Sequence, residues 1–185
     1  PLLWIDPAVH GLRNVDVYAK LEYMNPFGSV KDRIAWGIVA PDIASIQEKK
    51  QTIIEMSSGN TAKALQAVAS IHGVSFKTIT NRIKVPEQKA ILRMLGAHIE
   101  ELPGTTDCYD PSDPNDPYVY IQREIASAGD AAYFTSQYTN ERNLETHYAT
   151  TGEEILRDVP VVDYFFGGVG TSGSTRGVAQ KLLER

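Results

Sequence analysis

Three segments of this sequence carry the residue types for chemistry: a lysine turn, a run of small polar residues and a glycine-rich loop. Lys31 lies in NPFGSVKDR (25–33), SSGNT occupies 57–61, and FFGGVGTSGSTRGV occupies 165–178. A lysine amine can form an imine with a carbonyl group. Hydroxyl, amide and backbone N–H groups can hold a carboxylate or a phosphate. Each segment is therefore a candidate for imine chemistry or anion binding.

The lysine segment begins with a turn signal, Asn25-Pro26-Phe27-Gly28, and Ser29 can cap a helix that carries Lys31 in its first turn. A cation is disfavoured at the positive end of a helix, so this placement lowers the lysine pKa. A neutral amine is what an imine-forming lysine requires. The alternative is a solvated lysine paired with Asp32 or Glu22.

The SSGNT segment offers four polar side chains between a β-rich run and an alanine-rich helical pattern. Gly59 allows a close backbone approach to a ligand. The free N–H groups at the helix start add to the donors, so the segment can hold a carboxylate or phosphate. The alternative is a plain N-cap, which needs only one such residue. The predicted ligand-binding side chains are Ser57, Ser58, Asn60 and Thr61.

The glycine-rich loop fits G-x-G-x-x-G at Gly168, Gly170 and Gly173. A dinucleotide fingerprint also requires an acidic residue about 20 positions further on. Glu184 is the only acidic residue downstream, and it falls in the same helical pattern. The loop also lacks the G-K-[ST] of a P-loop. We therefore expect a cup for a single phosphate at a helix start, and a nicotinamide-dependent oxidoreductase is only a remote alternative.

Alternating strands and helices position these segments. Helix patterns include 62–72, ended by Gly73, and 86–95, ended by Gly96, with further helices at 117–128 and 143–157. Such alternation predicts an α/β fold with a mostly parallel sheet, whose ligands bind at the carboxyl ends of the strands. The predicted strands are 15–21, 51–56, 75–80, 97–102, 131–136 and 161–167.

The composition narrows the function classes. The 185 residues carry a net charge of −5, which argues against nucleic acid or an anionic membrane as the partner. No apolar run approaches the ~20 residues of a membrane span, and the start has no signal-peptide pattern. The single cysteine, Cys108, fits a reducing cytoplasm and reads as an exposed thiol. The acidic segment 105–118 reads as a surface connector with Asp116 as an N-cap, and we expect no metal site.

These segments, with SQYTN (136–140) and THYATTGEEI (146–155), resemble in order and spacing the fold-type II pyridoxal-phosphate enzymes. The sequence is most similar to the cysteine synthases (O-acetylserine sulfhydrylases), with cystathionine β-synthase next. The resemblance implies pyridoxal 5′-phosphate as cofactor and Lys31 as the lysine that carries it. It assigns the ring oxygen to Asn60 and the substrate carboxylate to the SSGNT side chains with Gln137. It places the cofactor phosphate on Gly170, Thr171, Ser172, Gly173 and Ser174.

The resemblance further implies a two-lobed enzyme and a homodimer. Residues 1–31 would start the large lobe, 32–140 would form a small mobile lobe with the substrate loop, and 141–185 would return to the large lobe. The implied reaction is β-replacement on a serine derivative, O-acetylserine plus sulfide giving cysteine and acetate. A cystathionine β-synthase-like reaction with another nucleophile is the alternative.

Two departures from the family pattern qualify these expectations. Ala62 stands where the family usually has glycine, which adds a methyl group near the site and leaves the substrate open. Family catalytic domains run to about 300 residues, a common size for two-lobed α/β enzymes. We therefore expect the C-terminal part of the large lobe, with the partner of the pyridine nitrogen, to lie beyond Arg185. An inactive fragment is the corresponding alternative.

Overall fold

A computed structural model gives the fold, and it describes residues 1–81, 83, 85–103 and 109–184. At its centre lies a four-stranded sheet in the order β5-β4-β3-β6, with every neighbouring pair parallel. The α/β fold with a mostly parallel sheet is therefore confirmed, and four predicted strands are found within two residues of their expected ends. They are β3 (Thr52–Met56), β4 (Phe76–Thr80), β5 (His98–Glu101) and β6 (Ala132–Phe134).

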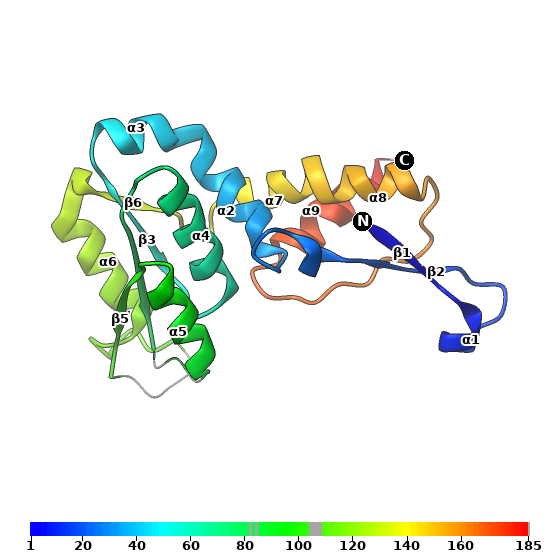
Figure 1. Ribbon diagram of the computed structural model, residues 1–185, viewed down its shortest axis with the longest axis horizontal. Coiled ribbons are helices and arrows are strands. Elements are labelled where there is room, and N and C mark those ends of the chain that lie inside the picture. Colours follow the sequence, from blue (N-terminus) through cyan, green and yellow to red (C-terminus); the bar gives the residue numbers. More distant parts are fainter. Residues whose placement is uncertain (82, 84, 104–108, 185) are drawn as a thin grey trace.

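Helices cover both faces of this sheet (Figure 1). Because side chains alternate along a strand, Ile53 packs into one apolar cluster and Ile54 into another. The Ile53 cluster is built with side chains of four helices, and the Ile54 cluster lies under α6 (Pro117–Ala128). The four helices are α2 (Lys31–Val39), α3 (Ile43–Glu48), α4 (Asn60–Ile71) and α5 (Pro86–Met94).

A second group of elements lies on the other side of α2 from the sheet (Figure 1). An antiparallel hairpin pairs β1 (Leu2–Ile5) with β2 (Val17–Lys20), which confirms the strand predicted at 15–21. The β1 strand was not predicted. The helices of this group are α1 (Pro7–His10), α7 (Arg142–His147), α8 (Glu153–Asp158) and α9 (Gly173–Leu183).

The predicted helix ends follow the expected capping chemistry. Gly73 and Gly96 take positive φ values of 64° and 89° just beyond α4 and α5. Asp116 caps α6 by accepting a hydrogen bond from the Tyr118 N–H at 2.8 Å. The helix predicted at 143–157 is continuous through α7, a π turn at Tyr148–Gly152 and α8. Short 3₁₀ turns occupy Glu22–Met24, Ala40–Asp42 and Gly129–Ala131.

The strand predicted at 161–167 is wrong. The segment runs without regular structure, and Tyr164 and Phe166 are 82% and 88% exposed. Its apolar, aromatic composition favours a strand, but a strand also needs a neighbour for its backbone hydrogen bonds. The sheet of the described residues ends at β6 and offers this segment no neighbouring strand.

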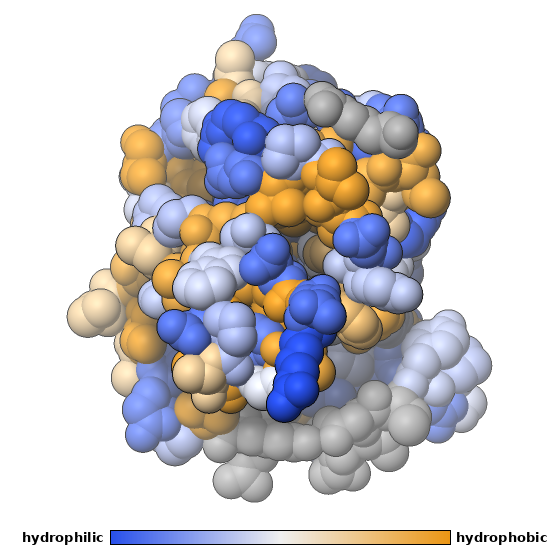
Figure 2. All heavy atoms as spheres, turned by 90° about the vertical axis from the view of Figure 1, so that its right-hand side faces the viewer, coloured by the Kyte–Doolittle hydropathy of each residue, from blue (hydrophilic) through white to orange (hydrophobic). Residues whose placement is uncertain are grey.

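Figure 2 views the side of β1, β2 and α8 and shows apolar side chains gathered on that face.

Part of the predicted acidic connector, with Cys108, lies outside the described residues. The described part is a series of turns in which Asp110 and Asp113 accept hydrogen bonds from Ser112 and Asn115 N–H groups. Within the described ranges, no helix is long and apolar enough to cross a membrane. The same ranges hold no group of three histidine, cysteine or acidic side chains placed to bind a metal ion.

Candidate active site

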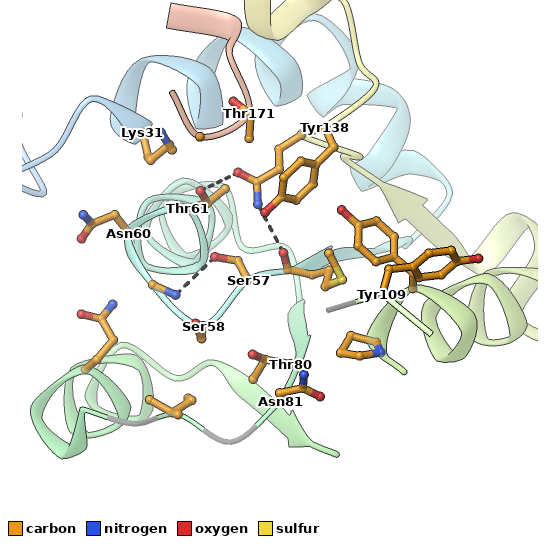
Figure 3. Close-up of a pocket in the computed structure, with 18 of the residues that line it drawn as sticks. Lys31, Ser57, Ser58, Asn60, Thr61, Thr80, Asn81, Tyr109, Tyr138 and Thr171 are labelled. Carbon is orange, nitrogen blue, oxygen red and sulfur yellow. Dashed lines mark hydrogen bonds between the residues drawn. The ribbon is translucent and has the colours of Figure 1, made fainter. Parts of the chain in front are cut away.

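A cavity of about 730 Å³ opens at the carboxyl ends of β3 and β4. Residues of three predicted segments line it, together with Gln137 and Tyr138 of the turn after β6 (Figure 3). The structure thus brings together side chains that are far apart in sequence, as the strand-end rule predicts. The predicted site residues on its wall are Lys31, Ser57, Ser58, Asn60, Thr61, Gln137, Gly170 and Thr171.

Lys31 is the first residue of α2, as predicted, and its side chain lies on the cavity wall. The N-cap of α2 is Val30 and not Ser29 as predicted, although the Ser29 hydroxyl accepts a hydrogen bond from the Lys31 backbone N–H at 3.1 Å. Burial lowers the pKa of the Lys31 amine. The predicted direction is therefore confirmed, with desolvation rather than the helix dipole as its cause. A lower pKa enlarges the neutral fraction that can act as nucleophile or base.

The SSGNT segment forms the turn from β3 into α4, and all five of its residues line the cavity. The Ser57 hydroxyl accepts hydrogen bonds from the Gly59 and Ala62 N–H groups, each at 3.3 Å. Thr61 is buried, and its hydroxyl donates to Gln137 Oε1 at 2.8 Å (Figure 3). The two predicted carboxylate-binding groups Thr61 and Gln137 are therefore held against each other.

Glu55, which was not predicted from the sequence, lies near the end of β3 and holds the backbone of Gln137. It is 1% exposed, and its carboxyl accepts hydrogen bonds from the N–H groups of Met56 at 2.8 Å and Gln137 at 3.0 Å. The Thr135 hydroxyl donates to it as well. Burial raises the pKa of Glu55. An acidic residue inside the apolar run QTIIEM was the available signal, and its contacts tie the end of β3 to the end of β6.

The glycine-rich loop reaches the cavity only at its start. Gly170 and Thr171 line the wall, whereas the predicted Ser172, Gly173 and Ser174 do not. Ser172 takes φ 60° and precedes α9, whose first residue is Gly173. The loop therefore leads into a helix start, where backbone N–H groups have no partner within the helix.

An aromatic wall, formed by Tyr109, Tyr118 and Tyr138, lines the same cavity and was not predicted. The rings of Tyr109 and Tyr118 meet edge to face with centroids 5.6 Å apart, and Tyr118 and Tyr138 lie 5.9 Å apart. These residues come from the acidic connector, α6 and the turn after β6. Only the fold brings them together, so sequence spacing gave no signal.

Comparisons with known proteins show the family of the chain. The family model described as "Pyridoxal-phosphate dependent enzyme" matches residues 1–185. A hydrogen sulfide-producing enzyme from Fusobacterium nucleatum is 30% identical, with a TM-score of 0.82 over all of this chain and 58% of that one. Cysteine synthase from Entamoeba histolytica is 28% identical, with a TM-score of 0.86 over 100% and 54%.

The O-acetylserine dependent cystathionine β-synthase from Helicobacter pylori is also similar, at 28% identity and a TM-score of 0.84, over 100% of this chain and 59% of that one. The chain therefore spans between 54% and 59% of the length of these solved structures. The family match covers the whole chain, and the neighbours are cysteine synthase and cystathionine β-synthase types. The chain belongs to the family of pyridoxal-phosphate dependent enzymes.

Proposed function

We propose that the protein catalyses β-replacement on a serine derivative, with O-acetylserine and sulfide giving cysteine and acetate. The observation that carries the proposal is the shared cavity: the Lys31 amine, the SSGNT turn and Thr171 all line it. These are an amine, a carboxylate-binding turn and a phosphate-binding loop, the three groups that a phosphorylated carbonyl cofactor and an amino-acid substrate need.

The residues of the cavity fit pyridoxal phosphate. A Cβ added to Gly59 or Gly170 would meet no atom within 4 Å, so the backbone at both positions faces open space that a ligand can fill. Thr171 on the cavity wall offers a hydroxyl for a phosphate, and burial holds the pKa of the Lys31 amine below its usual value. When bound, pyridoxal phosphate supplies the electron sink for chemistry at the substrate Cα and Cβ.

The chain's own residues bind, orient and move a proton. The Ser57 and Ser58 hydroxyls, with the N–H groups at the start of α4, hold the substrate carboxylate and fix the direction of the Cα–H bond. Asn60, also on the cavity wall, would hold the ring oxygen of the cofactor. Burial lowers the pKa of the Lys31 amine, and in its neutral form Lys31 Nζ would accept the Cα proton as general base. Acetate leaves Cβ, hydrosulfide adds there, and Lys31 Nζ would return the proton to Cα to give cysteine.

A second nucleophile is an alternative on the same site, because the aromatic wall of the cavity gives an organic thiol apolar surface to contact. The similar Helicobacter pylori enzyme bears the name of an O-acetylserine dependent cystathionine β-synthase. Steady-state rates with sulfide and with homocysteine, each against O-acetylserine, distinguish the two reactions.

The test of the proposed function is covalent attachment of the cofactor. Full-length protein is incubated with pyridoxal phosphate, reduced with borohydride and digested, and the modified peptide is located by mass spectrometry. We expect the label on Lys31, loss of the visible absorption band in Lys31→Ala, and O-acetylserine-dependent cysteine formation in the wild type. Lys63, which is half-buried on α4 and does not line the cavity, provides the control Lys63→Ala. Absence of label from a folded wild-type protein would refute the proposal.

The lobes, the assembly and the location are also proposals. We propose that residues 32–140 form the mobile lobe between the two large-lobe segments 1–31 and 141–185. Both apolar clusters of the central sheet are built within 32–140, which supports an independently packed unit. A homodimer in the cytoplasm is proposed from the family resemblance and the single cysteine.

A further inference from the structure

Asn143 lies behind the cavity wall, on α7, and joins two predicted parts of the site. It is 3% exposed, and its Nδ2 donates to the Gln137 carbonyl at 2.8 Å and to Thr171 Oγ1 at 3.0 Å. Its side chain lies against the start of α9, where a Cβ on Gly173 would come within 2.0 Å of Asn143 Oδ1. Asn143 is therefore fixed between the turn after β6 and the glycine-rich loop.

The orientation of the Asn143 amide follows from its partners. The Gln137 carbonyl can only accept a hydrogen bond, so the atom facing it must be the amide nitrogen. The same nitrogen then faces Thr171 Oγ1, and this contact makes the hydroxyl oxygen an acceptor. The opposite orientation would place two acceptors, Asn143 Oδ1 and the Gln137 oxygen, against each other.

This orientation decides what the Thr171 hydroxyl offers to the cavity. Within the described part of the chain, Thr171 Oγ1 has no other hydrogen-bond partner. Since the oxygen accepts from Asn143, its own hydrogen is left to donate elsewhere, and Thr171 lines the cavity. A hydroxyl hydrogen directed into the cavity is complementary to an anion.

We infer that Asn143 is a positioning residue: it fixes the Thr171 hydroxyl as a donor toward the cofactor phosphate and links the phosphate loop to Gln137. This inference rests on the proposed function, because it assigns the phosphate to that loop. Asn143 acts through Thr171 and does not contact the ligand itself.

Asn143→Asp tests the inference because it keeps the side-chain shape and replaces the donor with an acceptor. The Thr171 hydroxyl would then donate to Asp and present lone pairs to the cavity. The probes are pyridoxal phosphate and pyridoxal, each titrated into full-length apoprotein. Both form the same bond to Lys31, so the ratio of their dissociation constants isolates the phosphate. We expect the preference for the phosphorylated probe to fall about tenfold, as for one hydrogen bond to a charged group.

Thr171 variants provide the matched controls. Thr171→Ser keeps the hydroxyl and should keep the preference, whereas Thr171→Val should lose it to the same extent as Asn143→Asp. Because both variants remove one interaction, the double variant should lose little more than either single one. The ³¹P resonance of the bound cofactor should shift in Asn143→Asp and stay unchanged in Thr171→Ser. Asn143→Ala, which removes the donor without adding a charge, replaces Asn143→Asp if that protein does not fold.

Each outcome has one meaning. Equal weakening of both probes by the Asn143 variants would indicate a purely structural role and overturn the inference. An unchanged preference in folded Asn143→Asp or Asn143→Ala would overturn it as well, as would additive effects in the double variant. A wild-type protein that binds neither probe would instead refute the proposed function.

Discussion

Gly37 on α2 faces Thr146 on α7 so closely that a Cβ on Gly37 would lie 1.9 Å from Thr146 Oγ1 and 2.9 Å from Thr146 Cβ. The opposite side of α7 meets α9 in the same way, because a Cβ on Gly177 would lie 2.5 Å from the Leu144 carbonyl oxygen. Two glycines thus let α7 fit tightly between the helix that starts with Lys31 and the helix that follows the phosphate loop. This packing sets the separation of the two proposed cofactor contacts.

We expect Gly37→Ala to destabilise the protein. Overpacking of a core contact costs about 1–3 kcal/mol, and rotating the Thr146 hydroxyl away does not relieve the overlap with Thr146 Cβ. The penalty should therefore exceed the roughly 1 kcal/mol that alanine gains over glycine in a helix. Urea unfolding measures the difference.

Two further variants show whether the overlap is the cause. Gly168→Ala is the control, since a Cβ there would meet no atom within 4 Å and its stability should stay near that of the wild type. The penalty of Gly37→Ala should shrink in a Thr146→Ala background, where the closest atom is absent. Equal penalties in both backgrounds would contradict this explanation.

We expect Thr61→Val to weaken the contact between Thr61 and Gln137 in the cavity wall. The Thr61 hydroxyl donates to Gln137 Oε1, and both side chains are 5% exposed. Valine has nearly the same shape but leaves that buried oxygen without its donor, which costs about 1–3 kcal/mol. We expect a lower free energy of unfolding and a higher KM for the amino-acid substrate. Thr61→Ser keeps the donor and should keep most of both, so an equal loss in the serine variant would exclude the hydrogen bond as the cause.

Much of this fold could be predicted from local patterns in the sequence. The strands of the sheet follow from apolar runs, and the helix ends follow from capping residues such as Asp116 and Gly73. The segment 161–167 has the composition of a strand, but pairing depends on a neighbour that composition does not reveal. In the same way, Lys31 and SSGNT were predicted from their own types and spacing. Asn143 was not, because its role comes from the Gln137 carbonyl and Thr171, which only the fold brings to it.

His147 should make the protein less stable in mild acid. It is 1% exposed, and burial lowers its pKa from 6.5 to about 4. In the unfolded chain His147 binds a proton below pH 6.5, whereas in the folded protein it does so only near pH 4. The free energy of unfolding therefore falls as the pH is lowered through this window. The loss should reach roughly 2–3 kcal/mol, since one pKa unit corresponds to about 1.4 kcal/mol. Urea midpoints between pH 7.5 and pH 4, values chosen to bracket the window, measure it.

His147→Asn removes the titration, so its stability should vary less with pH in that window, whatever its stability at neutral pH. His98→Gln is the comparison variant, because it removes a histidine at an exposed position on β5. If the stability of His147→Asn changed with pH as steeply as that of the wild type, His147 would not be the cause of the pH dependence.

Glu154 should act in a separate, more acidic window. Its carboxylate accepts two hydrogen bonds from Arg33, each at 2.8 Å, and one from Lys20 at 2.6 Å, which ties α8 to α2 and to the hairpin. The Arg33 guanidinium is the main cause that lowers the pKa of Glu154 from 4.5 to about 2. Because the folded pKa is depressed, the contribution is complete above pH 4.5 and is lost as the pH falls toward 2.

Glu154→Gln keeps the side-chain shape and removes the charge, so it should lower stability at neutral pH by about 1 kcal/mol, within the range of partly exposed ion pairs. Its stability should also vary less than that of the wild type as the pH falls from 4.5 to 2. Asp158→Asn is the control, because Asp158 forms its ion pair with its neighbour Arg157, whose side chain is 69% exposed. An acid slope in Glu154→Gln equal to that of the wild type would show that the Arg33 contact does not stabilise the fold. Above pH 4.5, the free energy of unfolding of Glu154→Gln should change with pH as it does in the wild type, because that window belongs to His147.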